Sequence, residues 1–192
     1  MAGPLVRMKP RRRRQGLTDY RKRLSLVKSG IERLVVRRSN RRIVVQLVKS
    51  KAGGDRTLLT VSSDVLSKYG WKASFKSVPA AYLTGLLAGK KAVENGIEEA
   101  IVDLGLYRSV KGSRLYAVVK GAAEAGLQVP FDEEMLPDED RIHGKHIVEY
   151  VGKISQTPFG WQFTASDRNY LLKLEDEVKR IKGEILGGGG DE

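Results

Sequence analysis

The sequence predicts an α/β protein with a mixed sheet, and three observations support this prediction. Two segments rich in β-branched residues, 31–38 and 41–50, are followed by a third at 57–63, as in consecutive antiparallel strands. A long apolar helix pattern at 78–96 then precedes a further short strand pattern at 98–106. A helix between two strands implies a crossover, so the last strand should pair in parallel. The expected core is ββ(β)αβα, with the crossover helices on one face of the sheet.

Residues 1–16 are expected to form an extended basic arm before this core. They contain four consecutive arginines and no apolar periodicity, so this segment should be disordered without its partner. A short helix follows, with Thr18 as candidate N-cap, Asp19 at its positive end and Gly30 as its end. The helical spacing gives it an apolar face of three residues: Tyr20, Leu24 and Val27.

The strands and the first crossover helix are bounded by recognisable signals. Residues 51–56 indicate a turn, and residues 64–77 indicate a loop with a short turn. Ser77 can cap the helix at 78–96, Pro79 is tolerated in its first turn, and Gly96 can end it. Its apolar side is expected to consist of Tyr82, Leu83, Leu86, Leu87 and Val93. Two glycines four residues apart, Gly85 and Gly89, favour close approach of this helix to the sheet.

The second crossover helix is expected at residues 114–126, with Ser113 as its cap. Residues 131–186 then form an acidic, partly helical extension, with a helical pattern at 142–154 and a loop carrying exposed aromatics at 157–163. The segment 164–186 is an amphipathic helix that should pack on the body or on a partner. Its apolar positions are Leu171, Leu174, Val178, Ile181 and Ile185. Residues 187–192 form a flexible tail, so the body of the protein is expected to span 17–130.

Charge is the most informative part of the composition. The chain of 192 residues has a formal net charge of +12, and its first 42 residues hold 15 Lys and Arg against two acids. The remaining residues hold 20 bases and 21 acids, so the whole positive excess lies at the front of the chain. A near-neutral body with a basic arm is typical of nucleic-acid binding. The alternative is that the basic N-terminus is a solvated tail or a targeting signal, but the basic run continues into sequence with the pattern of a fold.

Several other functional classes find little support. No apolar run approaches the roughly 20 residues of a membrane span, and the N-terminus lacks the apolar region of a secretory signal. The arginines do not alternate with large apolar residues, which disfavours a membrane-surface role. The chain has no cysteine, which excludes disulfides and thiolate zinc sites and fits a reducing compartment. We therefore expect no membrane partner, no small-molecule substrate and no cofactor.

Three motifs that could carry chemistry have plainer interpretations. Residues 85–91 resemble a phosphate loop, but their glycine spacing is one residue short and they lie inside a helix pattern. His143 and His146 could share a metal, although no cysteine joins them. A magnesium-dependent nuclease would need Asp55, Asp64 and Asp103 to converge, and their spacing gives no such indication. Asp103 is instead expected to order the loop that follows it, and we predict that the protein is not an enzyme.

Four basic clusters remain as candidate RNA contacts, and they comprise Lys9, Arg11, Arg12, Arg13 and Arg14 on the arm; Arg21, Lys22 and Arg23 on the first helix; Arg37, Arg38, Ser39, Asn40, Arg41 and Arg42 at the first strand turn; and Tyr107, Arg108, Lys111, Gly112, Ser113 and Arg114 before the second crossover helix. Arginine grips phosphate with two parallel donors and stacks on bases. The start of the second crossover helix could also bind phosphate through free N–H groups. RNA is favoured over DNA because no helix-turn-helix, zinc finger or basic zipper is present.

Three long motifs carry a resemblance to a known family. The segments YRKRLSLVKSGIERLVVRRSNRRIVVQLV and DLGLYRSVKGSRLYAVVKGAAEAGLQVP closely resemble the two signatures of universal large-subunit ribosomal protein L-eighteen, of the archaeal type. The acidic FDEEMLPDEDRIHGKHIVEYV resembles the extension of the archaeal and eukaryotic branch, whose eukaryotic counterpart is ribosomal protein L-five. The resemblance runs from about residue 9 to residue 163, and the closing helix matches more weakly.

The resemblance implies a cytoplasmic, non-catalytic ribosomal protein. Members of that family bind 5S rRNA, contact the large rRNA and anchor 5S rRNA in the central protuberance beside neighbouring ribosomal proteins. Transferred to this chain, the arm would thread into rRNA, and the RRSNRR turn at 37–42 and the loop at 107–114 would face 5S rRNA. The fold of the family, a mixed sheet with crossover helices, agrees with the element order derived above.

Overall fold

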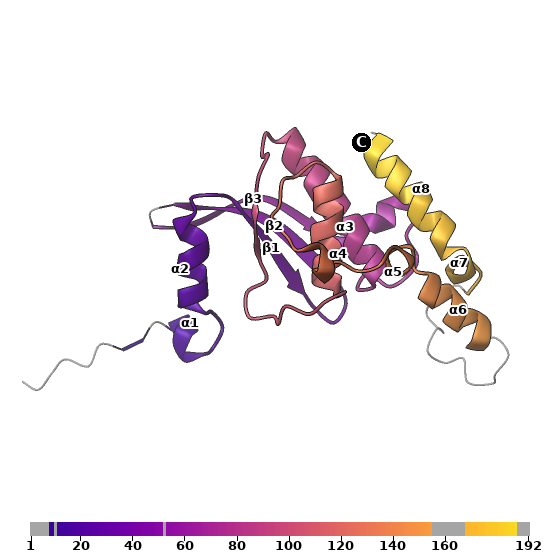
Figure 1. The fold of residues 1–192 in the computed structure, drawn as a ribbon, viewed down its shortest axis with the longest axis horizontal. Coiled ribbons are helices and arrows are strands. Elements are labelled where there is room, and N and C mark those ends of the chain that lie inside the picture. The colour runs from indigo at the N-terminus through magenta and orange to yellow at the C-terminus, as the bar shows by residue number, and fades with distance from the viewer. Residues whose placement is uncertain (1–7, 10, 52, 155–167, 188–192) are drawn as a thin grey trace, which may run out of the picture.

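A computed structural model describes residues 8–9, 11–51, 53–154 and 168–187 of the chain. Its centre is a four-stranded sheet in the order β3-β2-β1-β4 (Figure 1). The strands are β1 (Arg33–Arg38), β2 (Ile43–Lys51), β3 (Gly54–Ser62) and β4 (Ile101–Asp103). The three consecutive strands pair antiparallel and β4 pairs with β1 in parallel, which confirms the predicted mixed sheet and crossover. The turn predicted at 51–56 is shorter than expected, because β2 continues to Lys51 and β3 begins at Gly54.

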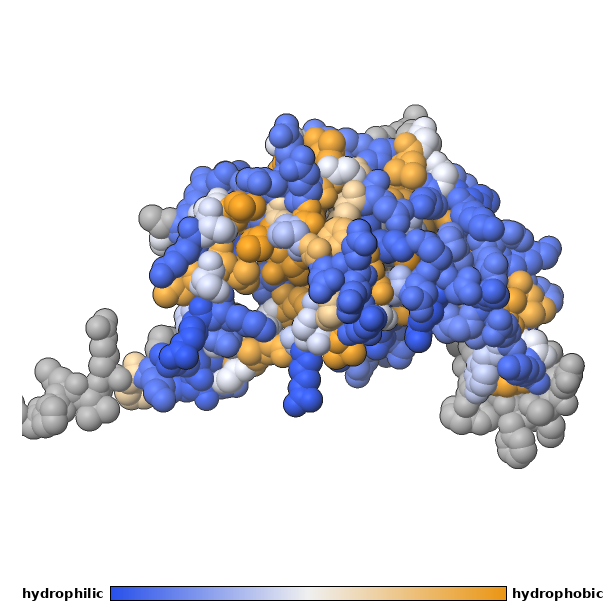
Figure 2. All heavy atoms as spheres, in the orientation of Figure 1, coloured by the Kyte–Doolittle hydropathy of each residue, from blue (hydrophilic) through white to orange (hydrophobic). Residues whose placement is uncertain are grey.

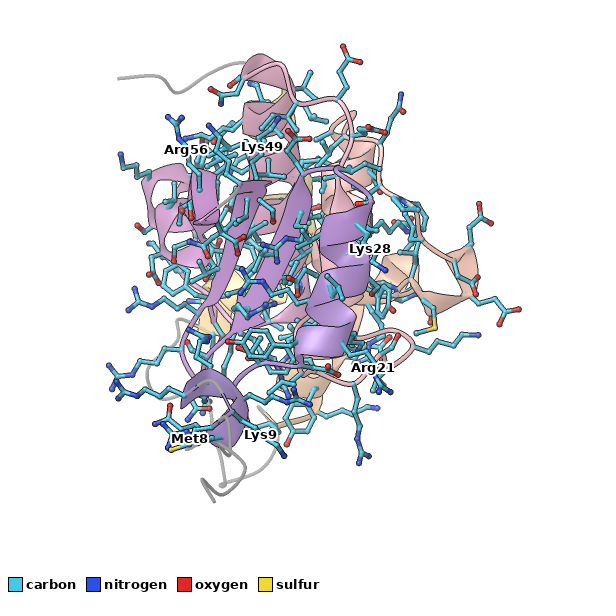
Figure 3. All side chains as sticks on the ribbon, turned by 90° about the vertical axis from the view of Figure 1, so that its left-hand side faces the viewer. Met8, Lys9, Arg21, Lys28, Lys49 and Arg56 are labelled. Carbon is cyan, nitrogen blue, oxygen red and sulfur yellow. The ribbon has the colours of Figure 1, made fainter. Side chains whose placement is uncertain are left out.

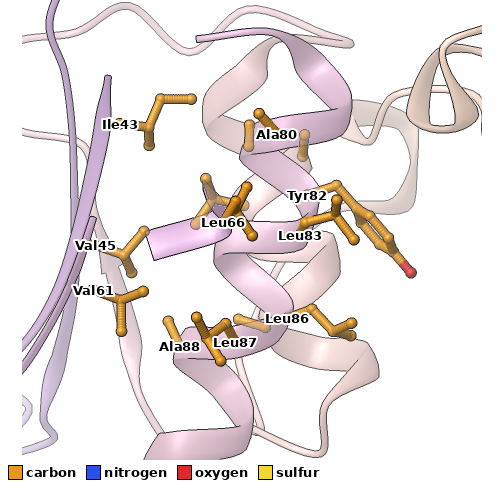
Figure 4. Packing of buried hydrophobic residues seen from close by; sticks show 14 of the residues in the cluster. Ile43, Val45, Val61, Leu66, Ala80, Tyr82, Leu83, Leu86, Leu87 and Ala88 are labelled. Atoms are coloured by element: carbon orange, nitrogen blue, oxygen red, sulfur yellow. The ribbon is translucent and has the colours of Figure 1, made fainter. Parts of the chain in front are cut away.

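Two helices cover one face of the sheet and form the core with it. They are α3 (Val78–Glu94), which Ser77 caps through the amide of Ala80, and α4 (Arg114–Glu124). Figure 4 shows apolar side chains of β2 and β3 facing those of α3. Before α3 lies a 3-10 segment, Ser63–Tyr69, within the region predicted as loop with a short turn. The sheet and α3 therefore enclose a core of apolar side chains, as β-branched strands and an apolar helix require.

Two expectations for α3 were wrong. An added Cβ at Gly85 would lie 2.1 Å from the carbonyl oxygen of Val118, so Gly85 and Gly89 admit the main chain of α4, not the sheet. Val93 was placed on the apolar side but is 44% exposed, although Ala92 beside it is fully buried. Helical spacing fixes which residues share a face, but it does not reveal which neighbour each part of that face meets.

The acidic extension folds into short helices that pack on α3. It contains a 3-10 turn (Glu133–Met135), α5 (Glu139–His143), α6 (Lys145–Ile154), α7 (Arg168–Leu172) and α8 (Leu174–Gly187). The five apolar positions predicted for the closing helix are all buried, although Lys173 separates α7 from α8. The ammonium of Lys90 on α3 donates to the carbonyl of Ile185 at 2.7 Å. Of the two alternatives left open, packing on the body is the one observed.

The N-terminal segment differs in detail from its prediction. Residues Arg11–Arg14 form α1, a single helical turn, where an extended chain was expected. Helix α2 (Tyr20–Lys28) is capped by Asp19, not Thr18, since the Asp19 carboxylate accepts from the amides of Arg21 and Lys22. Leu24 is 56% exposed, so the predicted apolar face of α2 is only partly used.

Some predictions fall outside the described residues. These are the first part of the arm at 1–7, the loop with aromatics at 157–163, the start of the closing helix at 164–167 and the last residues of the tail at 188–192. In the parts of the chain that the structure covers, no helix has the length and apolar character needed to cross a membrane.

Candidate nucleic-acid interface

The third and fourth predicted clusters form one surface. Because β1 and β4 are parallel, the β1–β2 turn and the loop after β4 emerge at the same end of the sheet. The Tyr107 hydroxyl donates to the carbonyl of Arg38 at 2.8 Å, and the Arg38 guanidinium lies 5.2 Å from the centre of the Tyr107 ring. These two contacts join segments 69 residues apart in the sequence. We call the surface formed by residues 38–42 and 106–111 the basic end.

Ser39 builds the turn of the basic end. Its hydroxyl accepts from the amides of Arg41 and Arg42, at 3.3 and 3.0 Å, and donates to the carbonyl of Arg42. This local bonding compacts the turn while the arginine side chains diverge. Asn40 is exposed at the tip of the turn.

The four arginines of the turn have different surroundings. The Arg37 guanidinium turns inward and donates to the main-chain oxygen of Asp103 at 2.7 Å and to its carboxylate at 3.1 Å. Arg42 makes an exposed ion pair with Asp64 at 2.8 Å. Arg41 is exposed and has no acidic partner among the described residues. Like charge is therefore tolerated here partly because the fold itself supplies two carboxylates.

Arg33, which the sequence analysis did not single out, organises the face of the sheet opposite α3 and α4. We call this the uncovered face. Its side chain is only 5% exposed, and its guanidinium donates to Asp103 at 2.8 Å and to Asp55 at 2.6 Å. Asp55 also accepts from Arg23 on α2 at 2.9 Å. Asp55 and Asp103 thus link Arg23 on α2 with two arginines on β1. This network of ion pairs holds α2 against the sheet. The alternation of Arg33, Val35 and Arg37 along β1 was the sequence signal for this shared face.

The network keeps both carboxylates ionised. For Asp103, burial opposes ionisation, but the charges and hydrogen bonds of Arg37, the amide of Gly105 and Arg33 outweigh burial and lower its pKa. For Asp55, burial is likewise outweighed by hydrogen bonds from Arg33 and Ser50, which lower its pKa. The bond from the Gly105 amide, at 2.8 Å, confirms that Asp103 orders the loop after β4.

A groove of about 950 Å³ lies between α2 and the uncovered face of the sheet. Arg12, Lys22, Arg37 and Tyr107 are among the residues that line it, so it connects α1 and α2 with the basic end. Figure 2 shows apolar side chains gathered in the hollow beside α2, with hydrophilic residues around them. The groove therefore presents basic side chains and apolar side chains together.

The arm and α2 supply exposed cations beside this groove. Arg12 donates to the Thr18 hydroxyl at 2.9 Å, and Arg23 is held by Asp55. The others are exposed, without an acidic partner among the described residues: Lys9, Arg11, Arg13, Arg14, Arg21 and Lys22. Figure 3 shows Lys9 and Arg21 pointing outward on the same side of the molecule.

The start of α4 is partly occupied by internal contacts. The Arg114 guanidinium donates to the carbonyl of Lys76 at 2.9 Å, and Lys111 lies 3.8 Å from Glu134. Ser113 occupies the N-cap position, but its buried hydroxyl makes no capping bond. Gly112 adopts φ +67°, a left-handed conformation that favours glycine at this bend. Arg108 is exposed, with no acidic partner in the described parts of the chain.

The arrangement does not support the alternative enzyme. Asp55 and Asp103 do converge, but on Arg33, while Asp64 pairs with Arg42 on the other side of the turn. Within the described ranges, no group of three or more His, Asp or Glu side chains could hold a metal ion. The glycines of 85–91 lie inside α3 and serve packing, as predicted.

Comparison with known proteins gives one consistent result. A family model described as "Ribosomal large subunit proteins 60S L5, and 50S L18" matches residues 6–99. Proteins named large ribosomal subunit protein uL18 are similar over most of the chain. That of Methanothermobacter thermautotrophicus is 44% identical over 189 residues, covering 95% of this chain and 98% of the relative. That of Caldivirga maquilingensis is 50% identical over 188 residues, covering 94% and 90%. That of Korarchaeum cryptofilum is 51% identical over 150 residues, covering 78% and 77%.

Proposed function

The chain belongs to the uL18 family of large ribosomal subunit proteins, and we propose that it binds 5S rRNA, contacts the large rRNA and anchors 5S rRNA in the central protuberance. Membership makes it a structural constituent of the large subunit in the cytoplasm, with rRNA and other ribosomal proteins as partners. The family points to a structural role and not to catalysis.

The observation that carries the proposal is the basic end. It brings exposed guanidiniums from two distant segments to one surface, and Arg41 and Arg108 have no acidic partner there among the described residues. The ion pair of Arg42 with Asp64 is exposed on both sides, so it contributes little stability and can exchange for a phosphate. A polyanion at this surface would remove the repulsion that remains between the arginines.

We assign two kinds of role to the predicted residues. Direct contact with RNA falls to the partly buried Tyr107 and to those that are exposed, namely Lys9, Arg11, Arg12, Arg13, Arg14, Arg21, Lys22, Arg38, Asn40, Arg41, Arg42, Arg108 and Lys111. Positioning falls to those held by internal contacts, namely Arg23, Arg37, Ser39, Gly112, Ser113 and Arg114. The proposed division of labour places the rRNA arm at 1–16, the 5S-binding core at 17–130 and the acidic extension at 131–186.

Binding of this kind is driven by the release of counterions. Each phosphate neutralised contributes roughly 0.7 to 0.9 to the slope of log affinity against log salt. Engagement of about eight basic residues gives a slope near −6 to −7 by the same rule. A measured slope shallower than about −2 for 5S rRNA would contradict the electrostatic mechanism.

The test is a double variant at the basic end, R38A/R41A, with K173A/K179A as its control. Both variants remove two exposed charges, but the control pair lies beside or on α8, far along the chain. Arg37 is left intact because its loss would strip Asp103 of a partner. We expect R38A/R41A to lower the magnitude of the salt slope by about 1.5 and to weaken 5S rRNA binding, with the control unchanged. Equal affinities for the two variants, with circular dichroism confirming folding, would refute the proposed contact surface.

A further inference from the structure

The end of the β2–β3 hairpin, residues 49–56, carries a second set of basic side chains that no predicted cluster includes. Figure 1 shows this end projecting past the helices that cover the sheet. β3 is exposed from Gly54 to Leu58, and a Cβ added at Gly53 or Gly54 would meet no atom within 4 Å. A two-stranded ribbon without a covering layer gains little from apolar burial. Core packing therefore does not explain the length of the hairpin.

The charges at this end are unbalanced. Lys49 and Arg56 are direct cross-strand partners, and Lys51 lies on the same side two residues along β2. Like charges placed opposite each other across strands are destabilising. The Glu32 carboxylate accepts from Lys49 at 2.6 Å, which leaves Lys51 and Arg56 without an acidic partner among the described residues. Figure 3 shows Lys49 and Arg56 at the opposite end of the view from Lys9.

The neighbouring acid, Asp55, cannot neutralise these cations. Its carboxylate is held by Arg33 at 2.6 Å and Arg23 at 2.9 Å, and it also accepts from the Ser50 hydroxyl at 3.0 Å. Asp55 and Ser50 point to the uncovered face of the sheet, where Arg33 lies. Side chains alternate along a strand, so Lys49, Lys51 and Arg56 project to the other side.

Protection of a sheet edge explains only part of this pattern. Charged side chains on an edge strand discourage pairing with other chains, and β3 is such an edge. This accounts for Arg56. It also covers Lys49 and Lys51, because β2 pairs with β1 only as far as Val48, but edge protection does not require two like charges opposite each other.

The hairpin end is too far from the basic end to share its counter-charge. β2 runs from Ile43, beside the basic end, to Lys51, nine residues in all. At about 3.3 Å per residue, its two ends lie roughly 26 Å apart. This exceeds the Debye length of about 8 Å at physiological salt, so an anion at one end scarcely affects the other.

We propose that Lys49, Lys51 and Arg56 form a second RNA-binding surface, which contacts the phosphate backbone of an rRNA segment other than the one at the basic end. This inference rests on the proposed rRNA-binding function and assigns part of that binding to a second surface. Lys51 and Arg56 are the direct contacts. Lys49 is paired with Glu32 and contributes mainly to the positive electrostatic potential of this surface.

The first test uses the absence of cysteine from the chain. Single variants K51C and R41C carry a tethered hydroxyl-radical probe and are assembled into large subunits, and the cleaved rRNA positions are mapped. We expect both probes to cut rRNA, at separate sets of nucleotides. Cleavage from R41C without cleavage from K51C would overturn the hairpin surface and leave the proposed function standing. No cleavage from R41C would count against the proposed function itself.

The second test distinguishes contact from mere nearness. K51Q/R56Q removes two charges from the hairpin and K173Q/K179Q removes two from the region of α8, and release from assembled subunits is followed as salt rises. If the hairpin binds phosphates, K51Q/R56Q should reduce the magnitude of the salt slope by about 1.5 relative to the control. An unchanged slope, with the melting temperature preserved, would overturn the proposal even if the K51C probe cuts RNA.

Discussion

The contact between α3 and α4 brings two main chains together at Gly85, and a methyl group there has an effect that can be worked out. The Cβ of alanine would lie 2.1 Å from the Val118 carbonyl oxygen and 2.8 Å from the Val118 Cα. Ordinary contact begins at 3.4 Å, so the helices must separate by about 1.3 Å. Overpacking of this kind costs about 1–3 kcal/mol, and main-chain atoms cannot swing aside, so we take about 3. Alanine regains about 1 kcal/mol of helix propensity, which leaves G85A destabilised by about 2 kcal/mol.

Gly183 on α8 provides the matched control, because it is also helical and an added Cβ there meets nothing within 4 Å. G183A should stabilise the protein by about 0.5–1 kcal/mol through helix propensity alone. The two variants should therefore differ by about 3 kcal/mol in urea unfolding followed by circular dichroism, or by roughly 6–12 °C in Tm. If G85A unfolds within about 0.5 kcal/mol of G183A, the helices are not in the close contact described.

Three further predictions concern the ion network and the closing helix. R33M removes the buried guanidinium that Asp103 and Asp55 share, leaving Arg37 on the first and Arg23 on the second. It should cost about 1–3 kcal/mol in urea unfolding at pH 7, whereas a loss below about 0.5 would mean that the network is dispensable. Burial would raise the pKa of Asp103, but Arg37 and Arg33 outweigh burial and lower it. The stability that ionised Asp103 contributes to the fold is therefore complete above the reference pKa of 3.8 and is lost as pH falls through its lower pKa in the folded protein. Acid unfolding should accordingly be less steep in D103N than in the wild type, and identical profiles would contradict this. I181A removes a fully buried side chain of α8 and should cost about 2–5 kcal/mol, while K179A on the exposed side should stay within about 0.5 in the same assay.

The secondary structure was accessible from the sequence where the signal is local. The β-branched runs gave β1 to β3, and the crossover argument gave the parallel pairing of β4. The cap at Ser77 was found because capping involves residues only three apart. Thr18 and Asp19 are both good caps, and only the observed backbone shows that the Asp19 carboxylate receives the two amides.

Breaks within helical patterns were harder to foresee. One helix was expected at 142–154, but Gly144 interrupts it with φ +82° and separates α5 from α6. The same glycine lies against Leu174, where an added Cβ would approach to 2.7 Å. Glycine therefore suits this position both by its left-handed backbone and by the close packing of α8, which begins 30 residues later in the chain.

The candidate interface, too, could be predicted from the sequence only in part. Its overall charge and its location at the front of the chain were visible in the composition, because net charge is a sum over residues and needs no coordinates. The roles of individual arginines were not visible. Arg37 and Arg41 are equivalent in the motif RRSNRR, yet one guanidinium donates to Asp103 and the other faces solvent.

The strands, the main helices, the crossover and the excess of positive charge in the first 42 residues could all be predicted from the sequence, since each follows from local pattern or simple counting. Which cations are free to meet phosphate, and which are already neutralised, became visible once the chain was folded. The physical reason is that an ion pair needs two charges within a few ångströms, and Arg33 and Asp103 reach that distance across 70 residues of chain.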